Sequence, residues 1–187
     1  MDSHITLLGS IIITSLLFVN VLNYQSEFKE HTFRQTNTLI VQNIAIGIIE
    51  VMEHDFHNIG FGVNGTAFAI ADSNLISYYV DLGADGTVDS VTYFISDTTA
   101  AATTPNPLDK ILYRVVNNQP LNDAALGVTH FRLRYFDHIG IETNDLDAIT
   151  TIEVSLEVQN TIDYDGQYSR FFCRERISPP SVLFVSP

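Results

Sequence analysis

The residues best suited to chemistry in the first third of this sequence are acids and histidines. Glu50, Glu53, His54 and His57 fall within two turns of a predicted helix, where side chains three or four residues apart can share a metal ion. No Glu-x-x-His pair is present in the sequence to complete such a metal shell. The pattern therefore favours a solvated polar helix face, and we predict no metal site there.

A second acidic group consists of Asp81, Asp85 and Asp89, which are spaced around a glycine turn. This spacing loosely resembles half of a calcium-binding loop, so the three carboxylates are the candidate metal ligands of the chain. Gly83 stands where such a loop needs another oxygen ligand, and no glutamate follows at the twelfth position of the loop. The sequence favours a plain hairpin turn over a metal site.

The other reactive side chains do not form a catalytic arrangement. Cys173 is the one cysteine, so it makes no disulfide within the chain, and a small core side chain is the commoner role for it. Asn64, followed by Gly65 and Thr66, matches the short acceptor pattern for N-glycosylation. No motif places a nucleophile beside a base. We expect no enzyme activity, no catalytic residue and no cofactor.

The acids and histidines at residues 50–57 belong to a long predicted helix. Residues 5–22 contain no charged side chain over eighteen positions, and a helix needs about 20 mostly apolar residues to cross a bilayer. A helical pattern without proline continues to about Ile59. The flank before the apolar run has no Lys or Arg, and no small-x-small cleavage site follows it. This favours a retained hydrophobic helix over a signal peptide.

The second half of this helix is predicted to be amphipathic. Its apolar residues recur in steps of three and four, which is the period of one helix face. We expect this stripe, in particular Ile48 and Met52, to be buried against a sheet. Gly47 lies at the edge of the stripe, where the missing side chain permits close approach of another backbone. The stripe consists of Val41, Ile44, Ala45, Ile48, Met52, Phe56 and Ile59.

The rest of the chain alternates like a β-sheet. Three glycines within residues 58–65 end the helix, and the residues from Gly83 to Gly86 predict a hairpin turn. Residues 98–107 are small or proline and predict a flexible or surface loop. The fold class is therefore α+β, with a helix over about 1–59 whose C-terminal half packs on an antiparallel sheet. The predicted strands are 67–71, 75–82, 87–95, 110–116, 128–136, 149–158 and 167–177.

Composition limits the partners of the chain. Nine Lys and Arg against 22 Asp and Glu give a formal net charge of −13. Nucleic acids bind through basic patches that neutralise phosphates, so we expect no nucleic-acid partner. Residues 1–27 are predicted to form a hydrophobic helix for a membrane or a filament core, and residues 28–187 a globular domain.

Three features of the sequence resemble the type IV pilin-like proteins, closest to the minor pilins and the J-type pseudopilins. The first is the apolar helix that runs into an amphipathic one, with Tyr24 near the junction. The second is the segment Glu53–Phe61, which is similar to the close of the helix in those relatives. The third is the order of sheet motifs at 78–87, at Val91-Thr92-Tyr93 and at Leu112-Tyr113-Arg114.

This resemblance implies a structural subunit of an extracellular filament. Such a subunit is anchored in a membrane before assembly and then polymerises with itself or with other pilin-like subunits at the cell surface. A membrane-anchored extracellular binding module is the alternative. The expected assembly residues are Met1, Asp2, Ile5, Leu8, Ile11, Ile12, Leu16, Phe18, Val19, Leu22 and Tyr24.

The sequence departs from the family at its start. The relatives carry a glutamate five residues into the mature chain, where this sequence has Ile5. Two interpretations stay open: the sequence is that of a mature subunit, or it belongs to a divergent relative that is processed otherwise. In related pilins the glutamate compensates a neighbour's N-terminal amine. We hypothesise that Asp2 or backbone carbonyl oxygens take this role for the Met1 amine.

Overall fold

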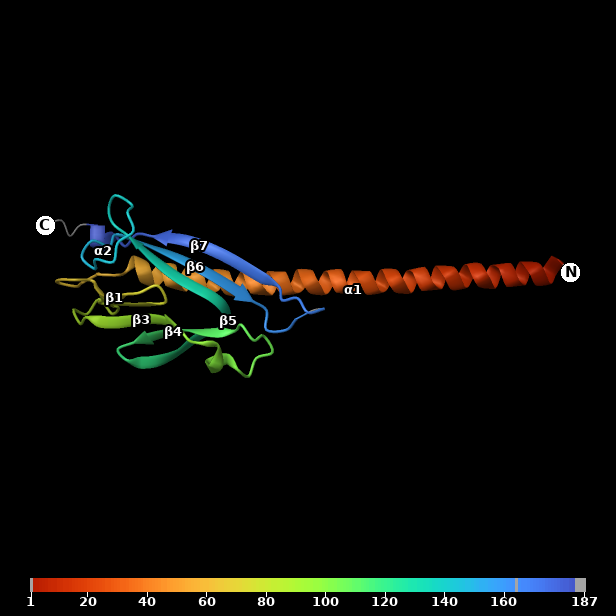
Figure 1. The fold of residues 1–187 in the computed structure, drawn as a ribbon, viewed down its shortest axis with the longest axis horizontal. Coiled ribbons are helices and arrows are strands. Elements are labelled where there is room, and N and C mark those ends of the chain that lie inside the picture. The colour runs from red at the N-terminus through yellow and green to blue at the C-terminus, as the bar shows by residue number, and fades with distance from the viewer. Residues whose placement is uncertain (1, 164, 184–187) are drawn as a thin grey trace. The chain divides into compact units, whose positions relative to one another are not determined.

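The computed structural model describes residues 2–163 and 165–183, with the backbone alone at 2, 5, 6, 120–123 and 183. It confirms the α+β class, because a long N-terminal helix is followed by a seven-stranded antiparallel sheet (Figure 1). The elements are α1 (Asp2–His57), β1 (Phe68–Ala71), β2 (Leu75–Val80), β3 (Asp89–Ile95), η1 (Thr98–Ala101), β4 (Lys110–Val116), β5 (Gln119–Phe136), β6 (Thr151–Gln159), β7 (Arg170–Ile177) and α2 (Pro180–Leu183).

Residue contacts divide the chain into two units, Met1–Leu39 and Ile40–Pro187. The described part of the first unit is helical throughout. The second unit, called the β-domain below, contains the last turns of α1 and all seven strands. The predicted boundary between a hydrophobic helix at residues 1–27 and a globular domain at residues 28–187 stays a prediction.

The sheet is a meander in which each strand pairs with the next along the chain, from β1 to β7. The prediction that β5 begins at residue 128 is wrong, because the strand already begins at Gln119. Asn117 and Asn118 both have positive φ, 51° and 60°, which makes a tight turn between β4 and β5. Gly127 has a φ of 87°, and the pairing register of β5 shifts just after it. This bulge is the point where the predicted strand began.

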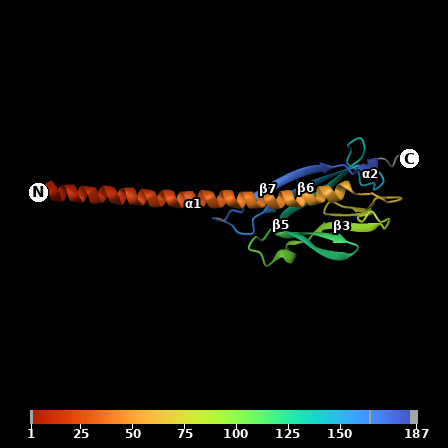
Figure 2. The same cartoon turned by 180° about the vertical axis from the view of Figure 1, so that it is seen from behind.

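The core lies between the sheet and the residues of α1 from Val41 onward (Figure 2). The apolar stripe is confirmed at most positions, because its members at 41, 45, 52, 56 and 59 are fully buried. Ile48 is only partly buried, and Ile44 is 41% exposed, so the stripe is narrower than predicted. Ile49, outside the predicted stripe, packs partly buried against the same core.

Met52→Ala is expected to lower the free energy of unfolding of the β-domain by about 2–5 kcal/mol, because it leaves a cavity at a fully buried position. Ile44→Ala, at an exposed position eight residues earlier, is expected to change that free energy by at most about 0.5 kcal/mol. Urea unfolding followed by the near-ultraviolet circular dichroism of tyrosine measures both. Equal losses for the two variants would contradict the assignment of the buried face.

The small-residue segment before β4 lies mostly on the surface, as its composition predicts, but two of its residues are buried. It contains the short helix η1, and Ala101 and Asn106 are buried at 3% and 1% exposure. The Asn106 side chain donates to Gln159 Oε1 and to the Asn160 carbonyl oxygen, at 3.1 and 3.3 Å. These bonds attach the segment to the end of β6, which composition alone does not indicate.

Candidate functional site

The first turns of α1 present apolar side chains that nothing in their own unit covers. Part of the helix is long and apolar enough to cross a membrane, with a mean hydropathy of 1.8 and none of that window buried. The α1 helix is thus compatible with a transmembrane segment. The side chains concerned are between 47% and 62% exposed and comprise Leu7, Leu8, Ile11, Ile12, Ile13, Leu16, Leu17, Phe18, Val19, Val21 and Leu22.

Three polar side chains in this segment bond within the helix itself. Ser10 Oγ donates to the Leu7 carbonyl oxygen and Thr14 Oγ1 to that of Ser10, each at 2.8 Å. Asn20 Nδ2 donates to the Leu16 carbonyl oxygen at 2.9 Å. Because these donors are already satisfied, they do not prevent the helix from entering an apolar environment.

The structure places most of the expected assembly residues on this exposed surface. Met1 lies outside the described residues, and Asp2 and Ile5 are described by their backbone alone, so the hypothesis on the Met1 amine stays a prediction. Leu7, Leu17 and others, which are not among the expected assembly residues, are equally exposed. The expected residues found exposed at 47–69% are Leu8, Ile11, Ile12, Leu16, Phe18, Val19, Leu22 and Tyr24.

A buried polar cluster attaches the last turns of α1 to the sheet. Asp55 is an acid in the last turn of α1, beside the buried apolar stripe, and is only 5% exposed. Its Oδ2 accepts hydrogen bonds from the Tyr93 hydroxyl at 2.6 Å and from Arg114 Nε. Arg114 Nε also lies 3.1 Å from the Tyr93 hydroxyl oxygen. A helix carboxylate is thereby held by β3 and β4 at once.

The electrostatics of this cluster are those of a desolvated ion pair. Burial raises the pKa of Tyr93 above its ordinary value, and the charge of Asp55 raises it further. Burial opposes the charge of Arg114, but the hydrogen bond and charge of Asp55 outweigh it and raise the pKa of the guanidinium. The Tyr78 hydroxyl is also buried and has no hydrogen-bond partner among the described residues. Removing any charged member leaves another buried charge without compensation.

Three residues from the sequence motifs described above, at positions 55, 93 and 114, meet in this cluster. Asp55 belongs to the segment at the helix end, and Tyr93 and Arg114 belong to the two later sheet motifs. Sequence reasoning did not assign them a common role. One feature of the sequence could have indicated this role. Asp55 is an acid directly before Phe56, a member of the apolar stripe that is fully buried.

A groove of about 470 Å³ lies beside the cluster, between α1 and the strands β3 to β5. A side chain added at Gly47 would meet no atom within 4 Å, so the close backbone approach expected at this glycine is not made within the described chain. Met52, Tyr93 and Leu112 line the buried side of the groove, and Ile44 and Val51 its exposed rim.

The acidic turn between β2 and β3 is held by its own carboxylates. Asp81 accepts hydrogen bonds from the backbone N–H groups of Asp85 and Gly86, at 3.1 and 2.8 Å. Asp89 accepts from Leu82 N at 3.2 Å, and Asp85 from Thr87 N at 2.8 Å. The three candidate metal ligands thus act as caps of a hairpin turn. Within residues 2–163 and 165–183, no group of three His, Cys, Asp or Glu side chains is arranged to hold a metal ion.

The first unit therefore presents an uncovered apolar helix surface, and the β-domain contains a buried polar cluster and a groove. No family model, curated protein or solved structure matches this chain.

Proposed function

We propose that this chain is a structural subunit of an extracellular filament of the type IV pilus or pseudopilus kind, anchored in a membrane before assembly. The observation that carries the proposal is the uncovered apolar surface of α1 between Leu7 and Leu22. Burying one large apolar side chain stabilises a protein by about 1.5–3 kcal/mol, so a helix with eleven of them exposed needs a covering partner.

Two partners suit such a helix, and a filament subunit uses them in turn. A bilayer accepts it because residues 5–22 carry no charge and the backbone bonds of a helix are internal. Copies of the same helix accept it as well. Ser10 and Thr14 are small residues one turn apart, and such pairs let helix backbones approach closely.

The second candidate is a membrane-anchored binding module. The groove beside Gly47 favours it, because a concave apolar surface with an arginine at its wall is a common form of ligand site. In that case the helix stays in the bilayer and the β-domain acts as a monomer.

A charge placed in the helix tests the proposal. Leu16→Asp is expected to reduce the yield of filaments sheared from cells by at least about tenfold, because an acid at the centre of an apolar helix is costly to bury. Leu108→Asp makes the same change at a position of similar exposure in the β-domain, 54% against 59%, and is expected to leave the yield unchanged.

Electron microscopy and sedimentation of the sheared material give the readout. Wild-type chain found only as a detergent-extracted monomer would favour the binding module. Wild-type chain found soluble, without membrane or filament, would overturn both functions.

A further inference from the structure

Charge is distributed unevenly over the chain. Five of its nine basic residues lie on β5 and β7, together with three acids on or beside the same outer side of the sheet. The remainder of the chain has four basic residues against 19 acidic ones. This arginine face is therefore a cationic surface on a strongly acidic protein. It consists of Arg132, Arg134, Arg170, Arg174 and Arg176, with Glu142, Glu153 and Glu157.

A buried carboxylate fixes the centre of the arginine face. Glu153 is 3% exposed and lies 2.8 Å from Arg176 Nε and 3.3 Å from Arg134 Nη1. The Phe136 ring contacts both guanidinium groups, at 4.5 and 5.1 Å from its centroid. Burial opposes the charge of Glu153, but the arginines outweigh it and lower the pKa of this carboxyl. The arginines are thus held in place before any partner arrives.

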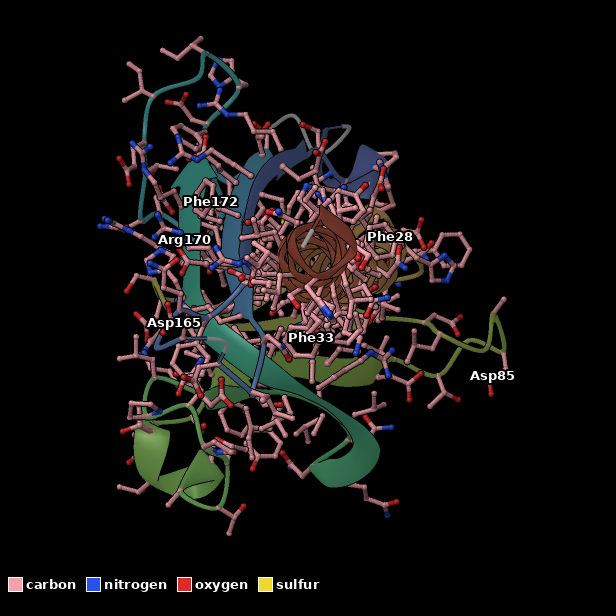
Figure 3. The ribbon with its side chains drawn as sticks, turned by 90° about the vertical axis from the view of Figure 1, so that its right-hand side faces the viewer. Phe28, Phe33, Asp85, Asp165, Arg170 and Phe172 are labelled. Carbon is pink, nitrogen blue, oxygen red and sulfur yellow. The ribbon has the colours of Figure 1, made fainter. Side chains whose placement is uncertain are left out.

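The edge of the arginine face is open. Arg170 and Arg132 are exposed, and the charge of Arg132 helps to lower the pKa of Glu142. Phe172 is 48% exposed, and Arg174 lies over its ring at 5.8 Å. Figure 3 shows Arg170 and Phe172 directed outward from β7 on the same side of the domain. An exposed aromatic ring flanked by arginines has the composition of a protein-binding hot spot.

A complementary surface lies elsewhere on the same domain. The turn between β2 and β3 carries the exposed acid Asp85 between Leu82 and Val88, whose side chains are 43% and 44% exposed. The backbone bonds to Asp81 and Asp89 fix this turn, so little conformational entropy is lost when it binds. In Figure 3, Asp85 lies on the opposite side of the β-domain from Arg170 and Phe172.

We propose that the arginine face of one copy binds the β2–β3 turn of the next copy. Phe172 packs against Leu82 and Val88, and Arg170 pairs with Asp85. Because the two surfaces differ and lie on opposite sides of the domain, the contact is heterologous and repeats from copy to copy instead of closing a dimer. The inference rests on the proposed filament function and specifies the contact between β-domains within it.

Charge reversal tests this contact in the full-length chain. Arg170→Glu and Asp85→Lys are each expected to lower the yield of sheared filaments by about fivefold, because each places like charges opposite one another. The two changes combined restore opposite charges and are expected to recover most of the wild-type yield. Lys110→Glu, the same charge change on β4 outside the arginine face, is the matched control and is expected to leave the yield unchanged.

The outcomes separate this inference from the proposed function. Wild-type filaments that neither single change affects would overturn the contact and leave the filament function standing. Absence of wild-type filaments would overturn both. Loss in the single variants without recovery in the double variant would assign the arginine face to another anionic partner and overturn the pairing of copies. Near-ultraviolet circular dichroism checks folding, and Phe172→Gln replaces Arg170→Glu if that variant does not fold.

Discussion

Replacing Asp55 by alanine is expected to lower the free energy of unfolding of the β-domain by about 3–5 kcal/mol. The variant leaves the Arg114 guanidinium, 14% exposed, without its counterion, and leaves the Tyr93 hydroxyl without its acceptor. A buried charge that loses its partner keeps the full cost of its desolvation. The loss should therefore exceed that of a hydrogen bond alone, which is about 1 kcal/mol.

Urea unfolding of the full-length chain in detergent, followed by the near-ultraviolet signal of tyrosine, measures this loss, because seven of the eight tyrosines belong to the β-domain. Glu53→Ala removes an acid of the same helix that is half exposed and is the matched control, with an expected change within about 0.5 kcal/mol. Asp55→Leu combined with Arg114→Met should recover much of the stability, because it removes both charges. An Asp55→Ala variant as stable as the wild type would mean that the cluster does not attach α1 to the sheet.

The elements that periodicity defines were predictable from the sequence. The strand at Lys110–Val116 has the predicted bounds, and α1 ends two residues before the predicted position. The first half of β5 was not predictable in the same way, because its turn depends on two asparagines that adopt positive φ. Asparagine tolerates this conformation without requiring it, so composition gives only a weak signal.

The polar features of the site depend on partners far apart in the chain. Asp55 bonds to residues 38 and 59 positions later, and helix periodicity contains no information on such pairs. Glu153 shows the same limit. Strand alternation correctly predicts that Glu153 lies on the face of β6 opposite Val154 and the core. It does not predict that arginines from β5 and β7 cover this carboxylate almost completely. Such clusters become visible only when the strand register brings their members together.

The three tyrosines buried in the β-domain should make the fold sensitive to alkaline pH. Tyr78, Tyr93 and Tyr135 are 1–3% exposed, and burial raises the pKa of each phenol above its ordinary value. The charge of Asp55 raises the pKa of Tyr78 and of Tyr93 further, and that of Asp72 does so for Tyr135. The neutral phenol is therefore the form that the folded state prefers.

The sign of the effect follows from proton binding. Below about pH 10 the three phenols are neutral in the folded and the unfolded chain, and their full contribution to stability is present. Above about pH 10 the unfolded chain releases these protons while the folded chain retains them, so the free energy of unfolding falls with rising pH. Each phenol contributes a slope of about 1.4 kcal/mol per pH unit, and the three together about 4 kcal/mol per unit. The loss continues until the pH reaches the folded-state pKa values.

Urea unfolding between about pH 9 and pH 11 measures this slope, and the ultraviolet absorbance of tyrosinate shows whether the phenols ionise with unfolding. The chain has two lysines, so few other groups release protons in the same range. Tyr135→Phe keeps the ring and removes one phenol, which donates to the Asp72 carbonyl oxygen at 2.8 Å. This variant should reduce the slope of the unfolding free energy against pH by about one third, because two phenols instead of three release a proton on unfolding. A slope unchanged in Tyr135→Phe, or phenols that ionise before the domain unfolds, would show that these tyrosines do not control the alkaline transition.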